Sequence, residues 1–161
     1  MGTYRRRTRV AAPLDEVWSF HSRVSGLEEL TPGFMDLRVE AVVGPDGEPD
    51  PEILERGATI RMSIRPFGIG PRQSWTSRIV EREERDGSAY FRDEMEDGPF
   101  PEWEHTHRFY GDGAGTVIVD EVRYRLPGGP LGGLAEPFGD VGFEPMFRGR
   151  HRKTKELLGR P

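Results

Sequence analysis

The chain has 161 residues, a length that fits one domain with a substantial buried core. Its net charge of −5 argues against a nucleic-acid partner, and its lack of cysteine excludes disulfides, thiolate chemistry and cysteine-based zinc sites. No stretch approaches the ~20 apolar residues of a membrane span, and no apolar run typical of a signal peptide follows the N-terminus. We therefore expect residues 1–161 to form one cytoplasmic domain, either monomeric or homodimeric.

The first predicted element is a strand over residues 3–11. Its arginines at alternate positions face one side, and Arg6 breaks the apolar pattern of the other side. A strand with a charge on both faces is typical of a sheet edge. The residues expected to share the inward face are Tyr4, Thr8 and Val10.

Two short helices are predicted next. Pro13 is a favourable residue for a helix start, and apolar residues then recur at helical spacing at Val17, Phe20 and Val24. A second helix is predicted from Ser25, as a candidate N-cap, to Leu30, before Pro32.

The central part of the chain predicts a set of antiparallel strands. In the first of them, apolar Leu37, Val39, Ala41 and Val43 alternate with Arg38 and Glu40. Gly-, Asp- and Pro-containing turns separate the later strands, so these should pair as hairpins. The six predicted strands cover residues 37–43, 60–64, 72–82, 89–96, 102–110 and 116–126.

The last element is a helix predicted over about residues 144–158. Its inward stripe is Phe143, Phe147, His151, Thr154 and Leu158. We expect its basic residues to form a solvated face, namely Arg148, Arg150, Arg152, Lys153 and Lys155. A long helix against an antiparallel sheet is an α+β arrangement, and a sheet curled around that helix has a concave side suited to a pocket.

Four ionisable residues interrupt the inward faces of the later strands. Side chains alternate across a strand, and in each strand the face opposite the charged one should point inward. Among aromatic and aliphatic neighbours, these faces carry Asp93, His105, His107 and Asp120. Because an unpaired buried carboxylate is costly, we expect the four groups to be partnered, hydrated or ligand-bound.

The hairpin turns predict which residues lie opposite one another. A turn centred on Pro99 and a four-residue turn over residues 112–115 fix the two registers. A one-residue slip would move every side chain to the other face. The predicted pairs are Asp93 with His105, Met95 with Trp103, His107 with Asp120, and Trp103 with Tyr124.

Four interpretations of this cluster stay open. It can be a structural polar network, or a patch that hydrogen-bonds the polar end of a ligand. It can also be an acid–base pair in which an Asp orients a His, or a zinc site built on His105 and His107. No HExxH-type motif supports the zinc site, and no nucleotide, flavin or haem signature is present, so we expect no metal and no cofactor.

Several motifs together resemble a known family. They are Pro13-Leu-Asp-Glu-Val-Trp18-Ser-Phe20, Phe91-Arg-Asp93, Gly98-Pro-Phe100, Trp103-Glu-His105-Thr-His107-Arg-Phe109, and the run from Asp120 to Pro127. With the closing helix, they make nearly the whole chain similar to the ligand-binding SRPBCC group of the START-like superfamily, also described as polyketide cyclase/dehydrase-like. The Trp-x-His-x-His-x-Phe stretch resembles one subgroup. The chain departs from the family pattern in a longer acidic loop over residues 44–55 and in Pro137 and Pro145 near the final helix.

The resemblance implies a helix-grip fold: a curved seven-stranded antiparallel sheet around a long C-terminal helix, with two short helices after the first strand. It also implies a cavity for a small, largely hydrophobic molecule such as a lipid, an aromatic compound or a polyketide. The expected ligand-binding residues are Trp75, Phe91, Asp93, Met95, Trp103, His105, His107, Phe109, Asp120, Tyr124, Phe143 and Phe147.

Two other functions remain open at this point. The first is an enzyme of cyclase, dehydratase or hydrolase type that uses His105 or His107, with Asp93 and Asp120, as acid and base. The second is a partner-binding module whose cavity is filled by side chains. The second alternative predicts no pocket of ~300 Å³ or more inside the sheet.

Overall fold

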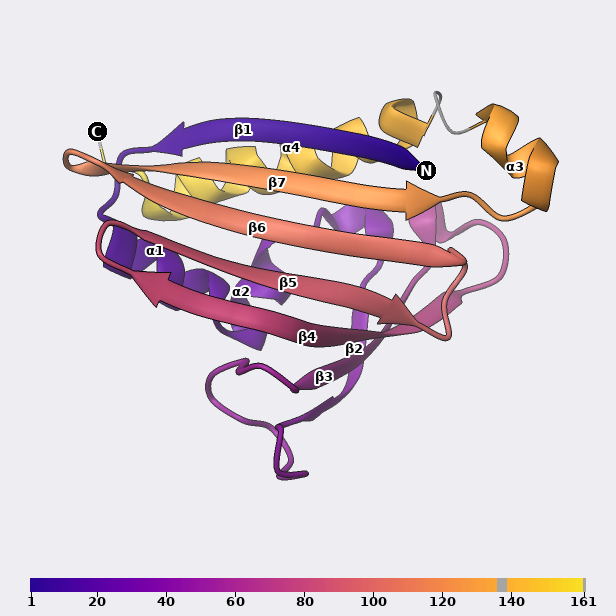
Figure 1. Ribbon diagram of the computed structural model, residues 1–161, viewed down its shortest axis with the longest axis horizontal. Helices are drawn as coiled ribbons and strands as arrows, with labels where there is room; N and C mark the ends of the chain where they lie inside the picture. The colour runs from indigo at the N-terminus through magenta and orange to yellow at the C-terminus, as the bar shows by residue number, and fades with distance from the viewer. Residues whose placement is uncertain (136–138, 161) are drawn as a thin grey trace.

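The structure, a computed structural model, describes residues 1–135 and 139–160. Within them, seven antiparallel strands form a curved sheet in the order β1-β7-β6-β5-β4-β3-β2 (Figure 1). The strands are β1 (Gly2–Val10), β2 (Arg38–Val43), β3 (Thr59–Ile64), β4 (Gln73–Arg85), β5 (Ser88–Glu96), β6 (Glu102–Asp112) and β7 (Gly115–Arg125).

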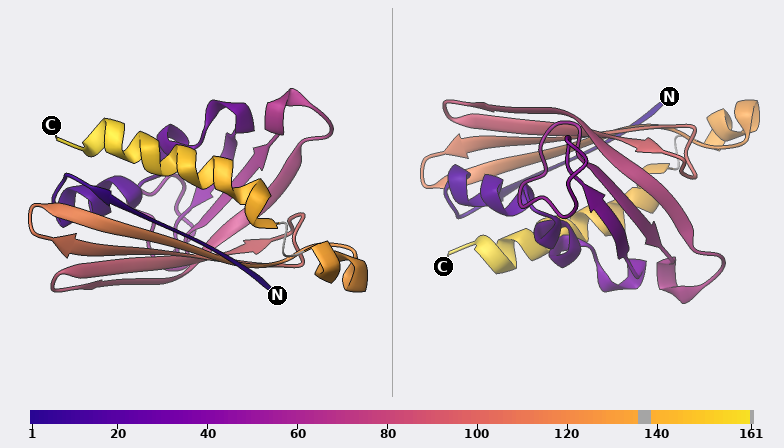
Figure 2. Two further views of the ribbon diagram at one scale, coloured as in Figure 1. Left: turned by 90° about the horizontal axis from the view of Figure 1, so that it is seen from above. Right: turned by 90° about the horizontal axis from the view of Figure 1, so that it is seen from below.

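The main helix lies across one face of this sheet (Figure 2). This arrangement confirms the predicted α+β helix-grip fold. The helices are α1 (Leu14–His21), α2 (Val24–Leu30), α3 (Gly129–Ala135) and α4 (Gly139–Leu158), with two 3-10 turns, η1 (Gly33–Met35) and η2 (Pro66–Gly68). No described helix is both long enough and apolar enough to cross a membrane.

The helix boundaries differ from the predicted ones in three places. The second helix is capped by Arg23 and already includes Ser25, so the predicted N-cap was wrong. Helix α3 was not predicted, because its glycines and Pro130 favour a break. Helix α4 begins before residue 144 and contains Pro145 inside it, whereas Pro137 lies outside the described residues.

The edge strand β1 carries a charge on its inward face for a specific reason. Tyr4 and Arg6 both point toward α4, where they reach the same carboxylate. The Tyr4 hydroxyl donates a hydrogen bond of 2.6 Å to Glu144, and the Arg6 guanidinium donates to the other oxygen of Glu144. The pair therefore attaches the final helix to the sheet edge.

Two β-bulges change which residues face inward. The first lies between Val39 and Ala41, so that Val42 is buried, while Ala41 and Val43, which the alternation groups with Leu37 and Val39, are exposed. The second follows Ile79. It turns Arg82, which strict alternation from Ile79 would place on the outer face, onto the ring of Trp18 at 4.2 Å.

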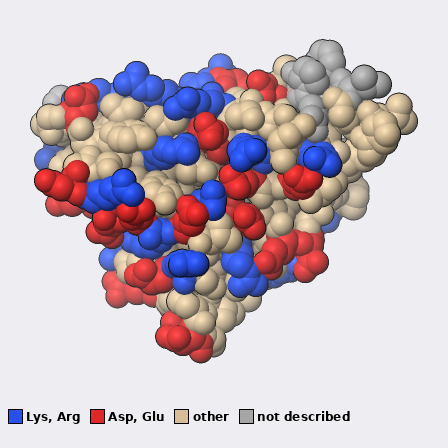
Figure 3. Space-filling view, viewed as in Figure 1, with Lys and Arg blue, Asp and Glu red and all other residues tan. Residues whose placement is uncertain are grey.

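The outer face of the sheet is a mosaic of opposite charges (Figure 3). Cross-strand pairs include Arg78 with Glu96 at 2.6 Å and Arg123 with Glu104 at 3.8 Å. Each exposed pair contributes only ~0–1 kcal/mol, so this face serves mainly to keep the sheet solvated. The buried apolar residues lie on the opposite, concave face, which is where the polar cluster is also found.

Candidate functional site

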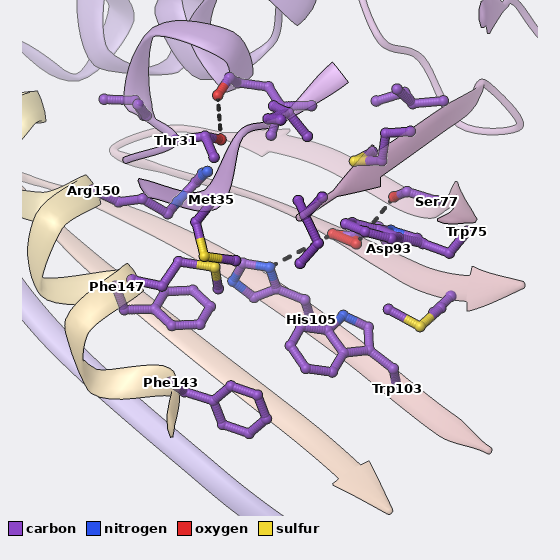
Figure 4. A pocket seen from close by; sticks show the side chains of 18 of the residues that line it. Thr31, Met35, Trp75, Ser77, Asp93, Trp103, His105, Phe143, Phe147 and Arg150 are labelled. Atoms are coloured by element: carbon purple, nitrogen blue, oxygen red, sulfur yellow. Dashed lines mark hydrogen bonds and ion pairs between the residues drawn. The ribbon is translucent and has the colours of Figure 1, made fainter. Parts of the chain in front are cut away.

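A pocket of about 540 Å³ lies between the concave face of strands β3–β6, helix α2 and helix α4 (Figure 4). Its wall is mostly apolar, with Leu27 on α2, Met62 on β3 and Trp75 on β4 among its lining residues. The pocket is within the size range of small-molecule sites, which is ~300–1,000 Å³. It exists because α4 covers the β1 side of the sheet more closely than the β3 side.

Nine of the twelve expected ligand-binding residues line this pocket. They are Trp75, Phe91, Asp93, Met95, Trp103, His105, His107, Phe143 and Phe147. The other three lie behind the pocket wall. Phe109 packs in the core near α1, Tyr124 packs with Tyr4 and Phe147, and Asp120 is buried beneath the histidines.

The strand registers place the four ionisable residues together. Asp93 pairs with His105, and His107 pairs with Asp120. The predicted pairing of Trp103 with Tyr124 is also confirmed, whereas the β5–β6 ladder ends before Met95. Strand β6 thus presents both histidines between two carboxylates.

Asp120 forms the inner part of the cluster and is only 3% exposed. Its Oδ1 lies 2.9 Å from His105 Nε2 and 2.9 Å from His107 Nδ1. Its Oδ2 accepts a hydrogen bond from Nε2 of His151 on α4. We call Asp120 and His151 the back layer, because neither residue lines the pocket.

Asp93, His105 and His107 form the front layer, which does line the pocket. Asp93 Oδ1 lies 3.5 Å from His107 Nε2 and 3.8 Å from His105 Nδ1, both longer than the contacts of Asp120. Its Oδ2 accepts a 3.1 Å hydrogen bond from Ser77. The front carboxylate is therefore less completely paired than the back one.

The contacts determine which of these groups are charged. Burial alone would raise the pKa of Asp120 and Asp93, but the neighbouring histidines hold both pKa values below the ordinary value, that of Asp120 well below. Burial alone would likewise lower the pKa of His107, but Asp120 and then Asp93 raise it. Burial, and then the charge of His107, lower the pKa of His105. The contacts therefore favour ionised carboxylates, and they favour a proton on His107 over a proton on His105.

Three further polar residues belong to this region and were missed by the sequence analysis as site residues. His151 was expected on the inward helical stripe but was not connected to Asp120. His21 lines the pocket, and its Nδ1 donates a 2.8 Å hydrogen bond to the Val17 carbonyl. Burial lowers the pKa of His21 to about 3, so it is neutral.

The third is Arg150, and its predicted position on a solvated helix face was wrong. It is half-buried and lines the pocket. A signal was present in the sequence, because Arg150 follows Phe147 by three residues and precedes Thr154 by four. That spacing places all three on one helix face.

The front layer has the donor set of a metal site. Asp93, His105 and His107 each offer one ligand atom, and these atoms lie within 4.8 Å of one another. Asp120 contacts the far nitrogen of each histidine, as carboxylates behind metal-bound histidines do. Three protein ligands facing a pocket can hold a zinc ion with an open position. The same geometry can hold a proton on His107, as described above.

Comparisons with known proteins place the chain among proteins of the same fold. The family model described as polyketide cyclase / dehydrase and lipid transport matches residues 10–148. No curated protein matches the sequence. Protein CV1439 from Chromobacterium violaceum is 14% identical, with a TM-score of 0.68 over 99% of each chain.

Two other solved structures are similar. Norcoclaurine synthase from Thalictrum flavum is 19% identical, with a TM-score of 0.68, over 97% of this chain and 92% of that one. A START superfamily protein from Mycobacterium smegmatis is 12% identical, with a TM-score of 0.65, over 98% of this chain and 97% of that one. At these identities the likeness establishes the fold. Because the family model covers most of its length, the chain belongs to the polyketide cyclase/dehydrase and lipid transport family.

Proposed function

We propose that this protein binds one small, largely hydrophobic molecule, such as a lipid, an aromatic compound or a polyketide, in the pocket beneath α4. The observation that carries the proposal is the composition of the pocket wall. It is apolar over most of its surface, and the front layer supplies a few convergent polar groups. This combination is typical of ligand sites, in which apolar area supplies affinity and a few polar groups set orientation.

The pocket volume argues against the partner-binding alternative. That alternative needs an interior filled by side chains, whereas the pocket here is about 540 Å³. The family description, which joins cyclases and dehydrases with lipid transport, supports a small-molecule ligand. Norcoclaurine synthase, a protein of this fold, has been solved in complex with dopamine and hydroxybenzaldehyde, and this supports an aromatic compound as one ligand class.

Native mass spectrometry of the gently purified protein, compared with its denatured mass, tests this proposal. We expect an added organic mass of a few hundred daltons that is lost on denaturation. An added metal mass that a chelator removes would instead support a metal site at the front layer. A bare polypeptide mass that stays bare after incubation with lipids and aromatic compounds would contradict the proposal.

A second candidate function is catalysis, favoured by the position of the front layer. His105 Nδ1 and His107 Nε2 both lie near Asp93 in the pocket wall, where a ligand atom could exchange a proton with them. His107→Gln separates the two functions. A binding protein should keep its affinity for an apolar ligand within about tenfold, whereas an acid–base enzyme should lose ~10²–10⁴ in rate.

A further inference from the structure

Arg150 is the one arginine or lysine among the described lining residues of the pocket. In Figure 4 its side chain extends from α4 toward Thr31 and Met35, into the space between α4 and α2. The guanidinium remains charged in proteins and can only donate hydrogen bonds. A half-buried group of this kind needs acceptor atoms, because burying an unpaired charge is costly.

Among the described residues, the Arg150 side chain has no hydrogen bond and no ion pair; only its backbone carbonyl accepts one, from Thr154. Burial lowers the pKa of Arg150, and Asp120 and Asp93 offset this only by attraction over a longer distance. Thr31, which lies near it in Figure 4, donates its hydroxyl proton to the Leu27 carbonyl at 2.8 Å, and its oxygen accepts no hydrogen bond from Arg150 among the described contacts. The nearby His21 donates from Nδ1 to the Val17 carbonyl, and among the described contacts its other nitrogen accepts no hydrogen bond from Arg150. Arg150 therefore points its donors into the pocket.

Arg82 is a buried arginine with a structural role, and its contacts can be compared with those of Arg150. Burial also lowers its pKa, yet its side chain is surrounded by partners. It donates a 2.9 Å hydrogen bond to Ser22, lies 3.6 Å from Glu55, and packs on the Trp18 ring. Arg150 has none of these kinds of partner among the described residues, so packing alone does not account for an arginine at this position.

We propose that Arg150 binds the carboxylate of an amphipathic acid whose apolar body fills the rest of the pocket. This inference rests on the proposed function and names the chemical class of its ligand. A carboxylate matches the guanidinium fork with two parallel hydrogen bonds. The apolar body would then lie along Leu27, Met62 and Trp75.

A preference for an anionic ligand has to come from groups inside the pocket, because the protein as a whole is negatively charged. A net charge of −5 repels anions at long range, so a preference for an acid over its neutral ester cannot come from the overall field. Within the pocket, the Asp93 carboxylate contacts both histidines and accepts a hydrogen bond from Ser77, and these contacts reduce its repulsion of a bound anion. Arg150 is then the group that makes the pocket prefer an anionic ligand to a neutral one.

Isothermal titration calorimetry at pH 7.5 with two matched ligand pairs tests the proposal. The pairs are dodecanoate with methyl dodecanoate, and 2-naphthoate with methyl 2-naphthoate. We expect the wild type to bind the acid at least tenfold more tightly than the ester in one or both pairs, since hydrogen bonds to charged groups are strong. The pair that shows the preference distinguishes a fatty acid from an aromatic acid.

Variants of Arg150 locate the effect. Arg150→Met should reduce the acid-to-ester preference to about one while leaving ester affinity within a few-fold. Arg150→Lys, which keeps the charge without the fork, should retain part of the preference. Arg152→Met, on the exposed side of the same helix, should leave it unchanged.

Two results would overturn the inference. The first is equal affinity for acid and ester in the wild type, or a preference for the acid that remains in a folded Arg150→Met variant. Either form would show that Arg150 does not bind the carboxylate, and the proposed function would remain supported. The second concerns all four compounds. Binding of none of the four compounds would contradict both this inference and the apolar-ligand function on which it rests.

Discussion

Asp93 on β5 and Asp120 on β7 lie on the same face of the sheet, on either side of strand β6 and its two histidines. Asp120 is closed in by three histidines and does not reach the pocket. Asp93 faces the pocket and makes longer contacts with two of them. The difference shows how a fold of this kind separates two tasks: the back carboxylate orients the imidazoles, and the front carboxylate leaves capacity for a ligand.

The largest expected effect is on the back layer. Asp120→Asn should lower the free energy of unfolding by ~3–5 kcal/mol, because its amide nitrogen would face a histidine donor inside the core. Asp93→Asn should cost less, ~1–3 kcal/mol, since its contacts are longer and partly solvated. Urea denaturation of both variants and the wild type measures the difference. A greater loss for Asp93→Asn would reverse the assignment of the two layers.

A middle-sized effect is expected from His21, a pocket histidine without a carboxylate hydrogen-bond partner. Its folded pKa is about 3, below its unfolded value, so it favours folding above pH 6.5. As the pH falls below 6.5 toward the folded pKa, the unfolded chain takes up the proton and this stability is lost. Between pH 7 and pH 5 the loss should be ~2 kcal/mol.

His21→Gln isolates this contribution from the other titrating groups. The difference in unfolding free energy between wild type and variant should change by that amount between the two pH values. Parallel pH profiles for the two proteins would show that His21 is solvated rather than held neutral in the wall.

The smallest effect is expected at Ser77, which donates one hydrogen bond to the front carboxylate. Ser77→Ala should cost ~0.5–1.5 kcal/mol in unfolding free energy, the usual value for one hydrogen bond. It should also leave the Asp93 side chain less firmly positioned. The binding free energy of a ligand with a polar end should then fall by more than the free energy of unfolding. A loss as large as that of Asp120→Asn would mean that the front layer is as closed as the back layer.

The sequence predicted the parts of this site that depend on alternation and on hairpin turns. Both follow from local rules, so the pairing of Asp93 with His105 and of His107 with Asp120 could be inferred from turn positions. The bulge after Ile79 could not, because an extra residue in one strand leaves no clear mark in the pattern.

The contributions of α4 could be predicted only in part. Helical spacing placed His151 on the inward stripe, but it does not say where along the sheet the helix packs, so its contact with Asp120 was not foreseen. Arg150 was assigned to solvent by its charge, although its spacing from Phe147 pointed inward. The prediction gave more weight to the charge of Arg150 than to its helical spacing. A charged residue that the fold holds partly buried is a good candidate for a functional residue.

The most direct test of the central claim is titration of the neutral fluorescent probe N-phenyl-1-naphthylamine into the wild type and into pocket-filling variants. Leu27→Trp on α2 and Ile64→Trp on β3 each place an indole in the pocket, and Val43→Trp adds the same group at an exposed position outside the lining residues. We predict saturable binding of one probe per chain to the wild type and to Val43→Trp, and a loss of at least tenfold in affinity in the two pocket variants. Equal binding by all four folded proteins would place the probe elsewhere and contradict an internal ligand site.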